Sequence, residues 1–286
     1  MQKYIVRNSL GFSRGGLISC PVPSEDFHLA DGHRPLASQC ITIGGATTLH
    51  AMVGKIEPNG AKELSLYPGK YNAARRVFGS TGHLQSPDYA LSIPNPTFGI
   101  SEITLRDYDI LVDYSSGSSG LGGLLDGKGI SLASDRSAAA LIQNGPVWAA
   151  VQGTTQVTGE TVASITSEVR VYSGSPTIEV VIGCSNASAG FFVTVPGHPA
   201  SACEIPHFTG PHSQGFAMTA GGEAVCWIAM DSTCTVSTET HQLLLPLIKD
   251  STNLWMRIIP VSEHLDTQFH DWCEAQFRPL AVEEVV

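Results

Sequence analysis

The chain has 286 residues, a formal net charge of −10 and 15% charged residues, where roughly 25% is typical of globular chains. An acidic chain gains nothing from the counterion release that drives nucleic-acid binding, so we expect no DNA or RNA partner. The first residues lack the apolar run of a secretory signal, and no stretch approaches the ~18 apolar residues of a membrane helix. These features predict synthesis in the cytoplasm and no membrane partner.

In the first half of the chain, short apolar segments between Gly- and Pro-bearing turns predict antiparallel strands. The predicted strands cover residues 4–6, 17–20, 40–43, 48–53, 63–67, 99–105 and 110–114. Residues 71–78 (YNAARRVF) predict one helical turn that ends at Gly79. The run SSGSSGLGG at 115–123 predicts a loop or linker, so we expect residues 1–114 to form an N-terminal β unit.

The second half has clearer strand patterns. From Ala163 to Tyr172 apolar and polar residues alternate, which predicts a long, half-buried antiparallel strand. Residues 124–261 are therefore predicted to form a β-sandwich domain. Its other predicted strands cover residues 148–152, 178–182, 191–195, 225–230 and 254–261.

The end of the chain carries a helical pattern. Leu265, Phe269 and Trp272 recur at helical spacing with Cys273 beside them, which predicts an amphipathic helix over residues 262–279 that covers a sheet face or an open edge. The predicted fold class is therefore all-β: an antiparallel sandwich or supersandwich with a small N-terminal β unit and one C-terminal helix.

The seven cysteines are odd in number, widely spaced and without a C-x-x-C motif. We expect reduced thiols, most of them buried as small hydrophobic side chains. They are Cys20, Cys40, Cys184, Cys203, Cys226, Cys234 and Cys273.

Three segments carry a family resemblance: Val6-Arg-Asn-Ser-Leu-Gly-Phe-Ser-Arg-Gly15, Asn144-Gly-Pro-Val-Trp-Ala149 and Val169-Arg-Val-Tyr-Ser-Gly-Ser-Pro176. They resemble the supersandwich β domain of the galactose-mutarotase-like group, especially the N-terminal β region of exo-rhamnogalacturonan lyase-like proteins. The resemblance covers about the first two-thirds of the chain, and it implies a supersandwich fold and a carbohydrate context. Catalysis in that family also draws on a helical toroid after the β region. No such pattern follows here, so the resemblance carries over no catalytic residue.

Two short motifs match catalytic patterns only in part. Gly11-Phe-Ser13-Arg-Gly15 matches G-x-S-x-G, but one strand precedes it and no helical pattern follows, which indicates a turn. The glycine-rich run at 117–123 lacks the Lys-Ser/Thr and the following helix of a phosphate-binding loop. We therefore expect no cofactor, and a non-enzymatic role is favoured while an enzymatic one stays open.

A Pro- and Gly-rich segment at 196–216 is predicted to form a long loop at one end of the sandwich. It carries five side chains that can contact a partner or ligate zinc: His198, Cys203, Glu204, His207 and His212. Their spacing matches no zinc template, so a metal site stays open and an interaction loop is the preferred interpretation.

Another stretch combines the carboxylates and aromatic rings that line sugar sites in glycosidases. The candidate sugar contacts are Asp107, Tyr108, Asp109, Asp113 and Tyr114. Asp109 and Asp113 are expected to share a strand face, and an exposed sheet edge explains these residues equally well.

Asp266, His270 and Glu274 share one face of the predicted helix. Two carboxylates beside a histidine can prepare it for acid–base work, but a solvated polar face explains the same pattern and is preferred.

Three functions remain after these exclusions. The first is a structural or recognition protein of a bacteriophage-like virion, in the tail, neck or capsid decoration, which self-assembles and contacts other virion proteins through its loops and terminal helix. The alternative is a carbohydrate-binding module, or a β module related to polysaccharide lyases or glycosidases, with a glycan as its partner. A cytoplasmic metabolic enzyme is the least favoured, because neighbours in the sequence assemble no acid–base or nucleophile set.

Overall fold

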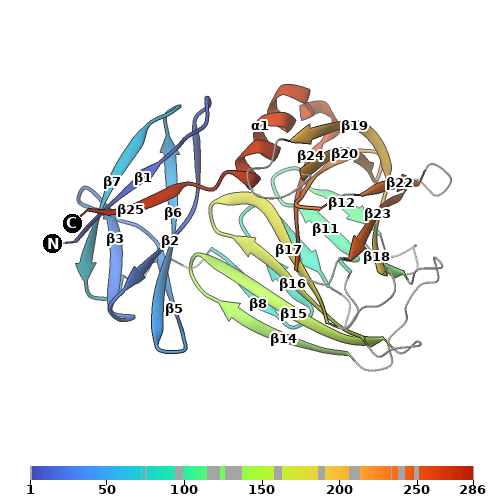
Figure 1. Cartoon of the computed structure of the whole chain (residues 1–286). Helices are drawn as coiled ribbons and strands as arrows, with labels where there is room; N and C mark the ends of the chain where they lie inside the picture. The colour runs from blue at the N-terminus through green and yellow to red at the C-terminus, as the bar shows by residue number, and fades with distance from the viewer. Residues whose placement is uncertain are drawn as a thin grey trace.

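In a computed structural model, the protein folds into two β-sandwiches, a small one and a large one (Figure 1). The structure describes residues 2–71, 73–74, 76–93, 99–114, 123–125, 137–157, 163–185, 191–205, 213–232, 234–237, 242–247 and 251–285. The predicted all-β class with antiparallel sheets and a C-terminal helix is confirmed.

The small sandwich pairs a five-stranded sheet, in the order β25-β1-β7-β3-β4, with a three-stranded sheet, β2-β6-β5. Side chains from both sheets, among them Tyr4, Leu49 and Leu64, are fully buried in the core between them. The strands are β1 (Lys3–Arg7), β2 (Arg14–Val22), β3 (Phe27–Asp31), β4 (Arg34–Pro35), β5 (Ser38–Ile43), β6 (Ala46–Ile56), β7 (Ala61–Pro68) and β25 (Ala281–Val285).

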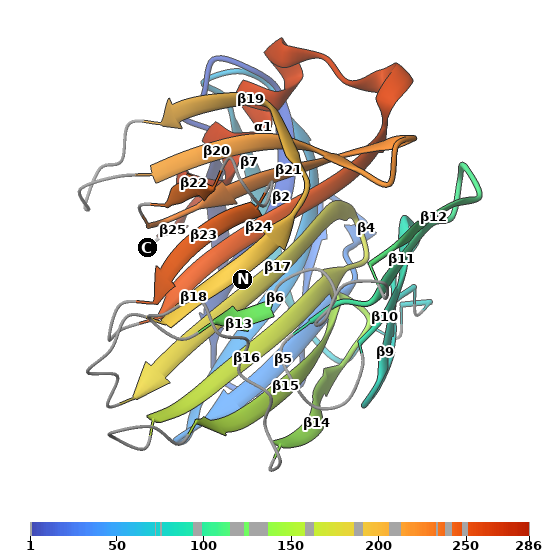
Figure 2. The ribbon, with the colours of Figure 1, turned by 90° about the vertical axis from the view of Figure 1, so that its right-hand side faces the viewer.

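The large sandwich is built on an eight-stranded antiparallel sheet, which crosses the molecule diagonally in Figure 2. Residues 163–172 form one of its long strands, as predicted, whereas Ala224–Met230 is buried at every position. The sheet is the platform for the candidate site. In sheet order the strands are β14 (Ser137–Asn144), β15 (Trp148–Val157), β16 (Ala163–Tyr172), β17 (Ser175–Ser185), β24 (Thr252–Pro260), β21 (Ala224–Met230), β20 (Ser213–Ala220) and β19 (His198–Ile205).

Two smaller sheets cover the inner face of this platform. The five-stranded sheet contains β12 (Ile110–Asp113), β11 (Glu102–Leu105), β10 (Tyr89–Ser92), β9 (His83–Gln85) and β8 (Phe78–Ser80). The four-stranded sheet contains β13 (Gly123–Leu125), β18 (Phe191–Pro196), β23 (Gln242–Leu247) and β22 (Thr235–Ser237). Apolar side chains from all three sheets form one large core.

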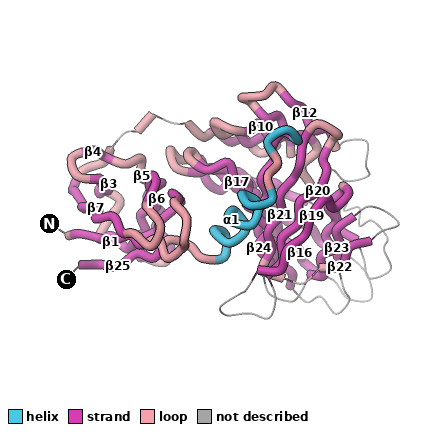
Figure 3. Tube along the Cα trace, turned by 90° about the horizontal axis from the view of Figure 1, so that it is seen from above, coloured by secondary structure: helices cyan, strands magenta, loops and turns pink. Residues whose placement is uncertain are grey.

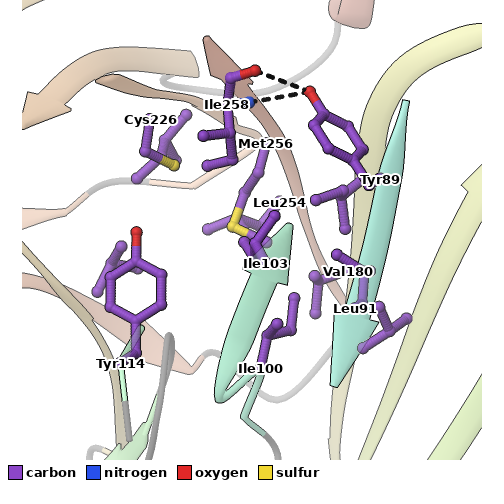
Figure 4. Packing of buried hydrophobic residues seen from close by; sticks show 14 of the residues in the cluster. Tyr89, Leu91, Ile100, Ile103, Tyr114, Val180, Cys226, Leu254, Met256 and Ile258 are labelled. Carbon is purple, nitrogen blue, oxygen red and sulfur yellow. Dashed lines mark hydrogen bonds between the residues drawn. The ribbon is translucent and has the colours of Figure 1, made fainter. Parts of the chain in front are cut away.

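Tyr89 shows how two of these sheets are joined (Figure 4). Its hydroxyl is buried within 2.8 Å of the Pro176 carbonyl oxygen and 3.0 Å of the Ile258 carbonyl oxygen, and the Ile258 N–H donates to it at 3.0 Å. Because a buried hydroxyl costs free energy unless it is hydrogen-bonded, this network fixes the position of β10 over the eight-stranded sheet.

The outer face of the eight-stranded sheet carries two different covers. The small sandwich lies over the β14–β17 end, and helix α1 (Asp266–Phe277), preceded by a 3₁₀ turn at Val261–Glu263, packs on β19, β20 and β21 (Figures 1 and 3). Phe269, Trp272 and Cys273 form the buried side of the helix against Trp227. The chain then returns to the small sandwich, where β25 pairs with β1.

The predicted helical turn at 71–78 is wrong within the described residues. None of residues 71, 73, 74, 76 and 77 is helical, and Phe78 begins β8, which pairs with β9. Val77 is fully buried in the large core, so tertiary packing outweighs the local preference.

The predicted linker at 115–123 is described only at Gly123, the first residue of β13. Buried residues between Val77 and Tyr114 share one hydrophobic core with buried residues between Ala149 and Ile258, whereas those between Tyr4 and Leu66, together with Leu280, form another. The predicted boundary itself falls on residues outside the described part and stays a prediction.

Candidate functional site

A cleft lies where the small sandwich meets the outer face of the eight-stranded sheet, and we call it the inter-sandwich cleft. Its cavity of about 590 Å³ falls in the range of small-molecule and sugar-sized sites. Strands β2, β5 and β6 form one wall, and β14, β15 and β16 form the other. The lining residues are Leu17, Ser19, Ile41, Ile43, Ala46, Thr48, His50, Ile142, Gln143, Trp148, Glu168, Arg170 and Tyr172.

The floor of the cleft carries a charged network. On β16 the inward positions Val169 and Val171 are buried in the large core, so Glu168, Arg170 and Tyr172 project to the outer face. Arg170 Nε donates to Glu168 Oε1 at 2.5 Å, and its Nη1 donates to Glu179 Oε2 at 3.2 Å. The Tyr172 hydroxyl donates to the same Glu179 oxygen.

Burial and charge act together on this network. Burial alone lowers the pKa of Arg170, but its hydrogen bond to Glu168 and the charge of Glu179 raise it above the ordinary value overall. The pKa of Tyr172 is also raised, first by burial and then by Glu179. Arg170 therefore stays a cation and Tyr172 a neutral donor at physiological pH.

Trp148 forms the aromatic wall of the cleft. The Arg170 guanidinium lies 5.3 Å from the centre of its ring, and the His50 ring meets it edge-on at 6.1 Å. The indole Nε1 is buried and has no hydrogen-bond partner in the described structure.

A buried glutamine holds the strand that carries Trp148. Gln39 Oε1 accepts from the backbone N–H groups of Val147, at 3.3 Å, and Trp148, at 3.1 Å. Its Nε2 donates to Gln143 Oε1 at 3.1 Å. Gln39 lies on β5 of the small sandwich, so this amide fixes the β14–β15 turn against the opposite wall of the cleft.

A second cavity, of about 310 Å³, continues the cleft past Leu17 and Tyr172 toward helix α1. Arg14 is buried in its wall, where Nε donates to Asn8 at 3.0 Å and Nη1 donates to the Ala275 carbonyl at 3.1 Å. Burial lowers the pKa of Arg14, and Glu274 partly opposes that effect. Arg14 thus ties the small sandwich to the terminal helix.

The predicted sugar contacts lie away from this cleft. Asp107 and Tyr108 are exposed in the β11–β12 turn and line a cavity of about 130 Å³, where the Tyr108 hydroxyl donates to Glu263 at 2.7 Å. Asp109 is in the same turn with φ +54°, so it does not share a strand face with Asp113, which ends β12. Tyr114 is buried in the large core.

That smaller cavity still has a notable electrostatic feature. Burial and the neighbouring Asp107 raise the pKa of Asp88, which lines the same space. A volume of about 130 Å³ is nevertheless small for a sugar ring, so the inter-sandwich cleft is the better candidate.

The predicted interaction loop is largely a strand. His198, Cys203 and Glu204 lie on β19, the edge strand of the eight-stranded sheet, because its register with β20 supplies backbone partners that the Pro and Gly content concealed. His207 and His212 lie outside the described residues. Among the residues that are described, no group of three or more His, Cys, Asp or Glu side chains is arranged to hold a metal.

On helix α1, Asp266 and His270 are exposed. Glu274 forms an ion pair with Arg278 at 3.4 Å. The exposure of Asp266 and His270 agrees with the preferred interpretation of a solvated polar face, whereas Glu274 is half-buried.

The residues of the cleft were not singled out from the sequence, although two signals were present. The alternation over 163–172 placed Glu168, Arg170 and Tyr172 on one face, and the segment 144–149 that carries the family resemblance contains Trp148. What was missing is the opposite wall, because nothing in the sequence indicates which face of the sheet the small sandwich covers.

His50 gives the cleft a pH dependence. Burial and the positive charge of Arg170 lower its pKa below the ordinary 6.5, and its Nδ1 lies 2.8 Å from Ser19 Oγ. The unfolded chain therefore binds a proton more readily, so the stability that His50 contributes is complete above about pH 6.5 and is lost as pH falls through its lower folded pKa.

We expect the urea midpoint to decrease as the pH is lowered from about 7.5 to about 5.5, and we expect a smaller decrease in His50→Gln. The matched control is His33→Gln, because His33 is exposed in a turn of the same sandwich. Equal slopes for His50→Gln and the unaltered protein would show that His50 does not couple the cleft to pH.

The comparisons with known proteins bear on the fold. No protein-family model matches the chain, and no curated protein matches it in sequence. A structure described as an alpha-mannosidase from Enterococcus faecalis V583 matches with a TM-score of 0.72 and 11% identity, over 100% of this chain and 46% of that one. A protein in the glycosyl hydrolase family 38 from Enterococcus faecalis matches with the same TM-score and identity, over 100% and 47%.

This likeness is one of fold. It extends over the whole chain, whereas the resemblance seen in the sequence covered about two-thirds of it. The chain spans slightly less than half the length of the two Enterococcus proteins. Within the described residues, no helix is long and apolar enough to cross a membrane.

Proposed function

We propose that this chain is a carbohydrate-recognition β module and that it binds an oligosaccharide in the inter-sandwich cleft. The observation that carries the proposal is the cleft itself: an aromatic wall, a fixed set of hydrogen-bonding groups and a volume of about 590 Å³ lie together at a sandwich junction. The fold shared with a structure described as an alpha-mannosidase supports a carbohydrate context.

The polar groups of the cleft suit recognition of sugar hydroxyls. A sugar hydroxyl both donates and accepts hydrogen bonds, and the network offers carboxylate acceptors beside guanidinium and imidazole groups. Arg170 holds Glu168 and Glu179 in place, which reduces the ordering that binding must impose on these side chains. Because the same guanidinium donates hydrogen bonds to both carboxylates, we assign these carboxylates to binding rather than to paired acid–base catalysis.

The sequence resemblance supplies the finer part of the proposal, namely kinship with the N-terminal β region of exo-rhamnogalacturonan lyase-like proteins. Two of the segments that carry it lie at the cleft: 144–149 contains Trp148, and 169–176 contains Arg170 and Tyr172. The predicted virion role, with self-association and virion partners, stays a prediction.

The test is a glycan array probed with the full chain, together with a depolymerisation assay on α-mannans and pectic polysaccharides. We expect selective retention of one glycan class without turnover. Turnover would replace recognition with an enzymatic function. If no class of glycan on the array retains the protein selectively, the result would contradict the proposal.

A further inference from the structure

A pair of cysteines joins the terminal helix to the edge of the eight-stranded sheet. Cys203 lies on edge strand β19 and is partly exposed, while Cys273 is fully buried on α1. All seven cysteines are free and lie among the described residues. These two are far apart in sequence but come together because α1 packs on β19 and β20.

Gly215 makes the approach of the two thiols possible. It is the register partner of Cys203 on the neighbouring strand β20. A Cβ at position 215 would lie 2.6 Å from Cys273 Sγ and 3.0 Å from Cys203 Sγ. Both sulfurs therefore occupy the space that any other residue's side chain would fill, and they face one another across it.

We propose that Cys203 and Cys273 form a thiol modification site, which a low-molecular-weight disulfide converts into a disulfide between strand β19 and helix α1. The Cys203 sulfur attacks one sulfur of the small disulfide, which leaves a mixed disulfide on Cys203 and releases one small thiol. The Cys273 sulfur then attacks Cys203 and releases the second small thiol. Two protein thiols lose two electrons, and their two protons leave on the two small thiols.

The surroundings of the pair divide the two roles. The neighbouring Cys273 thiol lowers the pKa of Cys203 and outweighs the opposing effect of burial, so Cys203 is the attacking thiol. Burial, and then the neighbouring Cys203, raise the pKa of Cys273, which suits a protected resolving thiol. Burial raises the pKa of the other two partly exposed thiols, Cys40 and Cys234. An accessible thiol of lowered pKa beside a second cysteine is the arrangement found in redox-responsive sites.

The disulfide would affect the rest of the fold through the helix. Ala275 and Gln276 of α1 line the cavity of about 310 Å³ that continues the cleft, and the chain continues from the helix into β25. A link between Cys203 and Cys273 would hold this terminal segment on the large sandwich.

The experiment exposes the reduced full-length protein to oxidised glutathione, blocks the remaining thiols by alkylation, and maps the products by peptide mass spectrometry. We expect the loss of two alkylatable thiols and one linked peptide pair, Cys203 with Cys273. In Cys273→Ser we expect glutathione to remain attached to Cys203, and in Cys203→Ser we expect neither product. Cys40→Ser, which removes a partly exposed thiol elsewhere, should react like the unaltered protein.

Circular dichroism of each reduced variant establishes that it is folded, and Cys203→Ala and Cys273→Ala replace any serine variant that is not. Any of three results would overturn the proposal. They are glutathione adducts without the Cys203–Cys273 link, a link between Cys20 and Cys40 in its place, and an unmodified Cys203 in Cys273→Ser.

Discussion

Gly145→Ala should lower the free energy of unfolding by about 2–4 kcal/mol. A Cβ at this position would lie 2.2 Å from both Cδ and Oε1 of the Gln39 side chain. Gln39 cannot simply turn away, because it is buried and its amide oxygen accepts from the N–H groups of Val147 and Trp148. If it withdraws, those buried donors lose their shared acceptor, and each buried donor left without a partner costs about 1–3 kcal/mol.

Urea denaturation followed by circular dichroism measures this effect. The matched control is Gly54→Ala, because a Cβ at Gly54 meets no atom within 4 Å. In a Gln39→Ala background the clash is gone, so adding Gly145→Ala should cost less than about 1 kcal/mol further. An unchanged urea midpoint for Gly145→Ala alone would show that Gln39 does not hold the β14–β15 turn as described.

The secondary structure that could be predicted is the part that local patterns determine. Over residues 165–171 every second position is buried, and three of the buried positions of β16 are the apolar Ile165, Val169 and Val171. The helical spacing of Phe269 and Trp272 likewise predicted α1, because one face of a helix must be buried. These elements carry their own signal whatever the rest of the chain does.

The elements that escaped prediction depend on distant partners. Ala281–Val285 contains two adjacent glutamates and four of its five residues are exposed, yet it pairs along its whole length with β1 at the other end of the chain. Strand β19 lies in the Pro- and Gly-rich segment 196–216, whose composition predicted a loop, and its pairing with β20 includes a register shift between Pro199 and Ser201. In both cases the strand is defined by its backbone partner rather than by its own composition.

The same limit applies to the candidate site. Asp107 and Tyr108 suggested a sugar site by their chemistry, but the structure gives them a cavity of about 130 Å³. The cleft has its aromatic wall on β15 and its opposite wall on β2, β5 and β6. Ala46 and Trp148, one from each wall, are about 100 residues apart in the sequence. Only the placement of the small sandwich over the large sheet brings these walls together.

The central claim is that a glycan occupies the inter-sandwich cleft, and filling the cleft should abolish binding. Ala46 is exposed, begins β6 and lines the cavity. In Ala46→Trp the indole would take space that the sugar needs while leaving Trp148, Arg170 and Glu168 in place. Ala61 provides a matched control, because it is also exposed and begins the next strand, β7, but does not line the cavity.

The decisive measurement is a calorimetric titration with the glycan selected on the array, performed on the unaltered protein, Ala46→Trp and Ala61→Trp, with thermal unfolding showing that all three are folded. We predict that Ala46→Trp weakens binding by at least roughly 100-fold, equivalent to about 2.7 kcal/mol, and that Ala61→Trp changes it by less than about twofold. Equal affinity for all three proteins would place the glycan elsewhere and contradict the account.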